Sequence, residues 1–144
     1  TRFTLLDSLN KRIKFLDEVI RINSLDGIET LHGRAEDYAR DKNYREAFDV
    51  CVSRAVANLS TLSEYCLPYV KVGGLFISYK AGQLDEELKA SERAIKLLGG
   101  EIKEVHKLTL PDTDIDRTFV VIKKTAATSK KYPRKAGLPS KEPL

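Results

Sequence analysis

The sequence predicts one α/β domain, built as an open and mostly parallel sheet with helices on both faces and an antiparallel final strand. Between residues 2 and 123, short apolar runs alternate with amphipathic stretches, which is the rhythm of strand followed by helix. The linker at 111–116, between the last two apolar runs, is too short for a helical crossover. Those two runs are therefore expected to pair as antiparallel strands.

Each element has its own signal in the sequence. Six apolar runs predict strands, at residues 3–6, 28–31, 48–52, 75–79, 102–110 and 118–122. Four stretches predict helices, at residues 8–22, 37–42, 58–69 and 84–98. Ser8 is the expected cap of the first helix. Gly73 and Gly74 are expected to break the chain between the third helix and the fourth strand.

Composition places the chain among globular proteins. Of its 144 residues, 42% are hydrophobic and 32% are charged. The apolar runs fall far short of the roughly 20 residues that span a bilayer, so we expect a cytoplasmic protein with no membrane segment. Cys51 and Cys66 lack the spacing of a zinc site, so we expect reduced core thiols and no metal.

Positive charge is concentrated at the C-terminal end. Residues 124–144 hold six Lys or Arg and one acid, a charge of +5 against +4 for the whole chain. We therefore divide the chain into a domain at 1–123 and a basic tail at 124–144. Such a tail favours a nucleic-acid partner, although a solubilising end has the same composition.

The start of the sequence is unusual for a nucleotide-binding α/β fold. Such folds carry a Gly-rich turn after the first strand and, about 20 residues later, an acid that holds the ribose hydroxyls. Asp7 stands at the position of that acid, and no Gly-rich turn precedes it. We expect the sequence to begin at the second strand, with the first strand and an N-terminal part absent.

Four sites at predicted strand ends could carry chemistry. The Asp7 carboxylate can accept two hydrogen bonds from a ribose diol, or instead stabilise the helix that follows. The turn from Gly33 to Glu36 would let an adenine approach the backbone at Ala35, or is a plain helix start. Arg54 follows the third strand, where a cation opposes a helix dipole, so function is favoured there. Lys80, at the end of the fourth strand, either points to the same edge of the sheet as Arg54 or is a solvated loop lysine.

Several segments together resemble the GidB methyltransferases. The resemblance rests on Asp7-Ser8-Leu9-Asn10-Lys11-Arg12, Arg34-Ala35-Glu36, Arg54-Ala55-Val56-Ala57, Leu67-Pro68 with Gly74 to Lys80, and Lys131-Tyr132-Pro133-Arg134-Lys135. It implies a class I methyltransferase sheet, which is Rossmann-like and ends in an antiparallel strand. It also implies transfer of a methyl group from S-adenosylmethionine to guanine N7 of 16S ribosomal RNA.

The resemblance and the residues together give the expected roles. Asp7, Ala35, Glu36 and Arg54 are the candidates for cofactor binding, and Arg54 and Lys80 are the candidates for catalysis. For RNA, the candidates are Arg34, Lys131, Tyr132, Arg134 and Lys135. The expected partner is 16S ribosomal RNA or the small ribosomal subunit, with the protein itself monomeric.

Two other functions remain open from the sequence. A nicotinamide-dependent oxidoreductase would also place Asp7 on a ribose, although its sheet would not end antiparallel. A non-catalytic RNA-binding module would use only the basic tail. Because the Gly-rich turn has no counterpart, we expect this chain to be inactive by itself.

Overall fold

The computed structural model describes residues 1–54, 57–82 and 84–144. Its helices and strands follow the predicted order, with one short helix added at the C-terminal end. The strands are β1 (Phe3–Asp7), β2 (Ile28–His32), β3 (Phe48–Arg54), β4 (Val70–Lys80), β5 (Gly100–Thr109) and β6 (Asp116–Lys124). The helices are α1 (Asn10–Ile22), α2 (Ala35–Tyr38), α3 (Leu59–Cys66), η1 (Leu67–Tyr69), α4 (Asp85–Leu97) and α5 (Leu138–Lys141).

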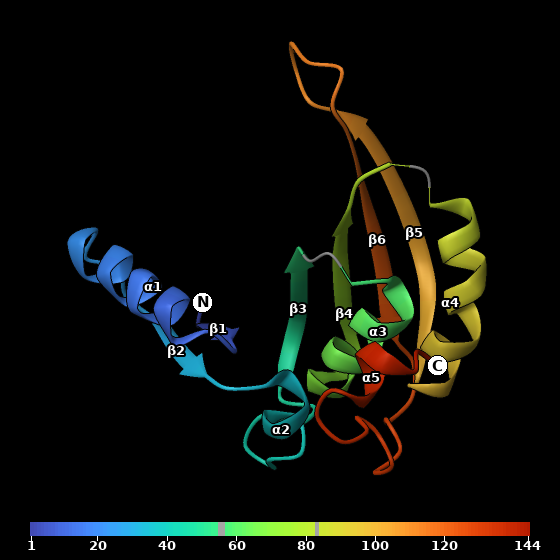
Figure 1. Ribbon diagram of the computed structural model, residues 1–144, viewed down its shortest axis with the longest axis horizontal. Helices are drawn as coiled ribbons and strands as arrows, with labels where there is room; N and C mark the ends of the chain where they lie inside the picture. Colours follow the sequence, from blue (N-terminus) through green and yellow to red (C-terminus); the bar gives the residue numbers. More distant parts are fainter. Residues whose placement is uncertain (55–56, 83) are drawn as a thin grey trace.

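The strands form two sheets. β1 and β2 pair in parallel as a two-stranded sheet, with Asp7 opposite His32 at their carboxyl ends. The other four strands form a sheet of order β3-β4-β6-β5. In Figure 1 the β1–α1–β2 unit lies to one side of the larger sheet, and no ladder joins β1 to β3 in the described part of the chain.

The predicted antiparallel ending is confirmed. β3 and β4 are parallel, whereas β6 pairs antiparallel with both β4 and β5. The β5–β6 hairpin extends well beyond the other strands, with its connecting loop at the far end (Figure 1). This mixed sheet is the ending that distinguishes the predicted fold from an all-parallel one.

The hydrophobic core lies on one face of the larger sheet. Phe76, Val120 and Ile122 pack there against α3 and α4, which also pack on each other. Both helices share this face because successive right-handed crossovers in one direction across a sheet put their helices on the same side. The opposite face exposes Val50 and Val52, so these two helices do not supply the second covering layer that the sequence predicted.

Three local predictions were wrong. Ser8 does not cap α1: Leu9 is the N-cap, and the Asp7 carboxylate accepts the Leu9 amide instead, at 2.8 Å. The second helix is a single turn at Ala35–Tyr38 rather than residues 37–42. Gly73 and Gly74 do not precede a strand but lie inside β4, which starts at Val70. A register shift in the β3–β4 ladder accommodates them.

The basic tail is folded onto the domain rather than loose. We call residues 125–144 the C-terminal strap, because they run back across α2 and α3 (Figure 1). The Arg45 guanidinium donates to the carbonyls of Thr128, Ser129 and Tyr132 in the strap. Lys124 ends β6, fully buried, with its ammonium on the carbonyls of Leu67 and Val70 and 3.1 Å from the Glu46 carboxylate.

Within the described residues, no helix is both long enough and apolar enough to cross a membrane.

Candidate functional site

The carboxyl end of β1 carries Asp7, the predicted ribose-binding acid. One carboxylate oxygen accepts the Leu9 amide, and the other is 3.3 Å from Arg12. The Asp7 side chain is 22% exposed, and Arg12 is mostly in solvent. The structural role that the sequence left open is therefore present, since Asp7 holds the start of α1. The carboxylate is also accessible, and its contact with Arg12 is long enough to give way to a ligand hydroxyl.

The turn at residues 33–36 lies against the end of β1. The Gly33 amide donates to the Asp7 carbonyl at 3.0 Å, which brings the turn beside the acid. A Cβ at Gly33 would lie 2.6 Å from Cε2 of Tyr38, so a larger residue would displace this ring, whose hydroxyl donates to the His32 carbonyl. The structure thus brings Asp7, Ala35 and Glu36 to one end of the small sheet.

The turn is held from behind by contacts that the sequence did not predict. Tyr69 is buried, and its hydroxyl donates to the Ala35 carbonyl at 2.6 Å. Burial raises the pKa of Tyr69, so the hydroxyl keeps its proton and remains a donor. The Glu36 side chain is only 4% exposed and accepts the Gly137 amide at 2.8 Å. The backbone of the turn therefore suits a ligand better than the Glu36 carboxylate, which is engaged with the strap.

Arg54 and Lys80 stand at the ends of neighbouring strands, but in different states. Arg54 is exposed at the end of β3, opposite Tyr79 of β4. Ala55 and Val56 of the same motif lie outside the described residues. The Lys80 side chain is 9% exposed, and its ammonium donates to the Ala57 carbonyl at 2.7 Å and the Glu87 carboxylate at 2.6 Å. Lys80 is neither a solvated loop lysine nor a free cation at the rim, because both contacts hold it inside the protein.

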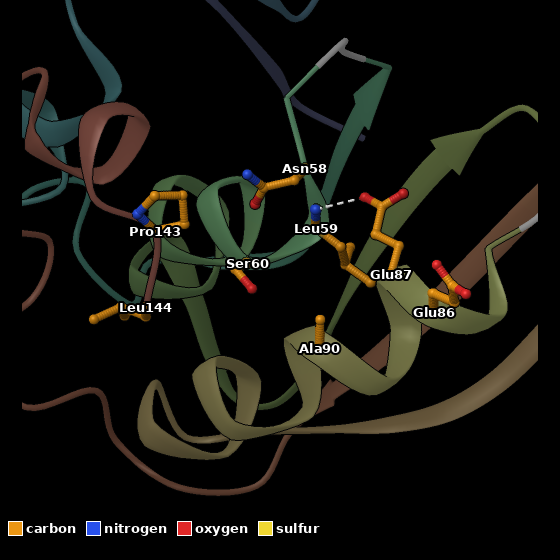
Figure 2. A pocket seen from close by; sticks show the side chains of 8 residues that line it. All are labelled: Asn58, Leu59, Ser60, Glu86, Glu87, Ala90, Pro143 and Leu144. Atoms are coloured by element: carbon orange, nitrogen blue, oxygen red, sulfur yellow. Dashed lines mark hydrogen bonds between the residues drawn. The ribbon is translucent and has the colours of Figure 1, made fainter.

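Glu87 extends this contact to the start of α3. The oxygen that meets Lys80 also accepts the Leu59 amide, at 2.7 Å (Figure 2). Lys80 and Glu87 therefore hold Ala57 and the start of α3 against α4. These contacts leave the Lys80 ammonium bonded within the protein, and its predicted catalytic role stays a prediction.

The predicted RNA-contacting residues divide into exposed and engaged groups. Arg34, Lys131 and Lys135 are exposed. Arg134 instead forms an ion pair with Glu64, a carboxylate that is fully buried, with Nη2 at 2.7 Å from Oε2. Tyr132 is half-buried against the core, so its ring is not an open stacking surface.

The structure also contains a hollow beside the Lys80–Glu87 contact. It has a volume of about 430 Å³ and lies between the start of α3, α4 and the end of the chain, as Figure 2 shows. Its lining residues include Glu86, Glu87, Pro143 and Leu144. Nothing in this lining resembles the predicted cofactor residues. Among the described residues, no group of three or more His, Cys, Asp or Glu could hold a metal ion.

Glu64, Tyr69 and Glu87 organise the site, and sequence reasoning missed all three. Glu64 and Tyr69 lie in helical segments 70 and 34 residues away from the residues they hold, whereas Glu87 is 7 residues from Lys80 and 28 from Leu59. A charged residue such as Glu64 within an otherwise buried helix is a weak signal of an internal partner. The sequence offered no such signal for Tyr69.

Comparison with known proteins supports the resemblance found in the sequence. Residues 1–119 match the family described as rRNA small subunit methyltransferase G, or GidB. A protein of that name from Clostridium tetani is 54% identical over 97% of this chain, and one from Alkaliphilus oremlandii is 57% identical over 98%. Each alignment covers 59% of the relative, so the chain spans a little over half the length of these proteins.

Solved structures with low sequence identity share the fold. A putative methyltransferase from Thermoplasma acidophilum has a TM-score of 0.65 at 11% identity, covering 88% of this chain and 59% of that one. An rRNA methylase from Streptococcus thermophilus has a TM-score of 0.61 at 12% identity, covering 87% and 74%. The fold is thus the Rossmann-like fold of class I methyltransferases, as the sequence predicted. The chain belongs to the GidB family, the rRNA small subunit methyltransferases G.

Proposed function

We propose that the protein containing this chain transfers a methyl group from S-adenosylmethionine to guanine N7 of 16S ribosomal RNA. The observation that carries the proposal is the placement of Asp7 beside the 33–36 turn, in a chain matched over residues 1–119 to a family of rRNA methyltransferases. Membership of a family of rRNA methyltransferases supports methyl transfer to ribosomal RNA. The position of Asp7 beside the turn supports binding of S-adenosylmethionine there.

The residues present fit the adenosine half of this cofactor. Asp7 offers an accessible carboxylate for the ribose hydroxyls, with one oxygen in a 3.3 Å contact with Arg12. The small Ala35 lets an adenine reach the backbone of the turn. Arg54 is the proposed organiser of the cofactor and the target base, because it is exposed at the carboxyl end of β3. Lys80 has a positioning role, since its ammonium is bonded to Ala57 and Glu87.

The chemistry asks for alignment rather than proton transfer. S-adenosylmethionine supplies an electrophilic methyl group on its sulfonium. Guanine N7 has an in-plane lone pair and no proton, so no general base is required. Holding the nucleophile about 3 Å from the methyl group can provide several kcal/mol of the rate enhancement. This chain contributes by fixing the adenosine and excluding other orientations.

The exposed cations are the proposed RNA contacts. Arg34, Lys131 and Lys135 are available for phosphate, whereas Arg134 is engaged with Glu64. Guanine N7 lies in the major groove, which is deep and narrow in A-form RNA, so the target is expected in a loop or unpaired. We propose a cytoplasmic enzyme, because ribosomal RNA is the proposed substrate, and we propose that it acts as a monomer.

Mapping modified bases in ribosomal RNA tests this function. A strain lacking the gene should lose one N7-methylguanine from 16S ribosomal RNA, and the wild-type gene should restore it. A gene with Asp7→Ala should restore it poorly, whereas one with Asp26→Ala, an exposed acid on a loop, should restore it fully. Persistence of every N7-methylguanine in the deletion strain would refute the proposal.

A further inference from the structure

We propose that the C-terminal strap is a positioning element of the 33–36 turn, and that the Glu64–Arg134 ion pair is its principal anchor. The proposal rests on the cofactor role given to that turn above. It assigns the strap a function within the protein, in contrast to the RNA-contacting tail that its composition predicts.

The strap reaches the turn directly. The Gly137 amide donates to the buried Glu36 carboxylate, across 101 residues of sequence. Gly137 has a φ of +85°, so the strap reverses there in a conformation that favours glycine. On the other side of the turn, the Ala35 carbonyl accepts both the Tyr69 hydroxyl and the Ala39 amide. The turn is therefore held between the strap and η1.

The strap is itself fixed by the Glu64–Arg134 pair. The Arg134 backbone amide and Nε both donate to Oε1 of Glu64, at 2.7 and 3.0 Å, and Nη2 donates to Oε2. Nη2 also donates to the Glu142 carbonyl at 2.7 Å, which ties down the end of the strap. The Glu64 contact raises the pKa of Arg134. A fully buried carboxylate that is paired in this way is costly to separate from its partner.

A second cluster fixes the strap on the far side of α2. Arg45 donates to the carbonyls of Thr128, Ser129 and Tyr132, and Arg40 donates to that of Pro133. Arg40 and Arg45 follow α2 in the chain, whereas Glu36 lies inside it. The strap thus brackets α2 at both ends. Release of the Arg134 anchor should loosen the bond at Gly137 and, with it, the turn.

Hydrogen exchange in the ligand-free chain tests this coupling. In Arg134→Met, the amides of Tyr38 and Ala39, which bond to carbonyls of the turn, should exchange about tenfold faster than in the wild type. The matched control is Lys135→Met, which removes the same charge from the next residue, one that is exposed. It should leave both rates unchanged. Unchanged rates in Arg134→Met, with the strap amides themselves deprotected, would overturn the proposal.

Two further variants cover the case in which Arg134→Met does not fold, since it leaves the Glu64 charge unpaired. Glu64→Gln/Arg134→Met removes both charges and should still speed exchange at Tyr38 and Ala39. Tyr69→Phe loosens the turn from the other side, and Tyr79→Phe, on a half-exposed ring, is its control. If the double variant and Tyr69→Phe both leave these rates unchanged, the turn does not depend on either support.

Titration with S-adenosylhomocysteine separates this proposal from the proposed function. The dissociation constant should rise several-fold in Arg134→Met and stay constant in Lys135→Met, with no RNA present. A role of Arg134 in RNA binding alone would not change it. If exchange responds as predicted but the wild-type protein shows no binding, the cofactor role of the turn is wrong and the structural coupling stands. If binding weakens equally in both variants, the loss of positive charge explains the effect, and the anchoring role of Arg134 is wrong.

Discussion

Lys80→Met should destabilise the chain by about 2–3 kcal/mol. The substitution keeps the length of the side chain and removes hydrogen bonds to the Ala57 carbonyl and the Glu87 carboxylate, at 2.7 and 2.6 Å. A hydrogen bond that involves a charged group contributes roughly 1.5–3 kcal/mol. The loss should stay below the full cost of stranding a buried charge, because Glu87 is 29% exposed and keeps the Leu59 amide.

Urea denaturation of the variant beside Lys71→Met measures this effect. Lys71 forms an ion pair with Asp49 at 3.2 Å, but both side chains are at least half exposed. Such a surface pair is worth less than about 1 kcal/mol, so the control isolates the effect of burial. In a double-mutant cycle, Lys80→Met and Glu87→Gln should be non-additive. Equal losses of stability in Lys80→Met and Lys71→Met would refute the positioning role and leave Lys80 free for catalysis.

Three further predictions concern acid stability, RNA and the cofactor. Burial raises the pKa of Glu46, but the Thr128 amide and Lys124 outweigh it and hold the pKa below its ordinary 4.5. The ionised Glu46 carboxylate therefore stabilises the fold above that pH, and this contribution is lost as the pH falls. Glu46→Gln should lower the free energy of unfolding by about 1–2 kcal/mol at pH 7, and by progressively less in urea denaturation at acid pH. Lys131→Ala/Lys135→Ala should lower the salt slope of RNA binding by up to about 1.5, and an unchanged slope in filter-binding assays would exclude phosphate contacts there. A full-length protein of the family should bind S-adenosylhomocysteine at least about tenfold more tightly than residues 1–144 in calorimetry, and equal affinity would contradict the expected contribution of a Gly-rich turn.

The sequence predicted the strands well because their apolar runs are short and clearly separated. The antiparallel pairing of β5 and β6 followed from the length of one linker, since no helix fits between Leu110 and Arg117. Boundaries were less certain where glycine allows either a break or a continuing strand. At Gly73 and Gly74 the strand continues, because β4 pairs with β3 on either side of them. Such pairing depends on residues far away in the sequence.

The positions of the candidate site residues were predictable, but their partners were not. Strand ends predict where Asp7, Arg54 and Lys80 lie. Whether a cation is free or paired depends on tertiary contacts, and Lys80 meets a carboxylate on α4 that no local pattern reveals. The same holds for Arg134: its charge predicted a contact with RNA, but its guanidinium is paired with Glu64 on α3.

Residue-resolved NMR can show whether the turn beside Asp7 binds the adenosine half of the cofactor. S-adenosylhomocysteine is titrated into the isotope-labelled chain at millimolar concentration, and amide shifts are followed. We expect the largest shifts at Asp7, Ala35 and Glu36. Shifts confined to the hollow between α3 and α4, at Leu59, Glu87 or Leu144, would contradict it, as would the absence of any shift at the turn.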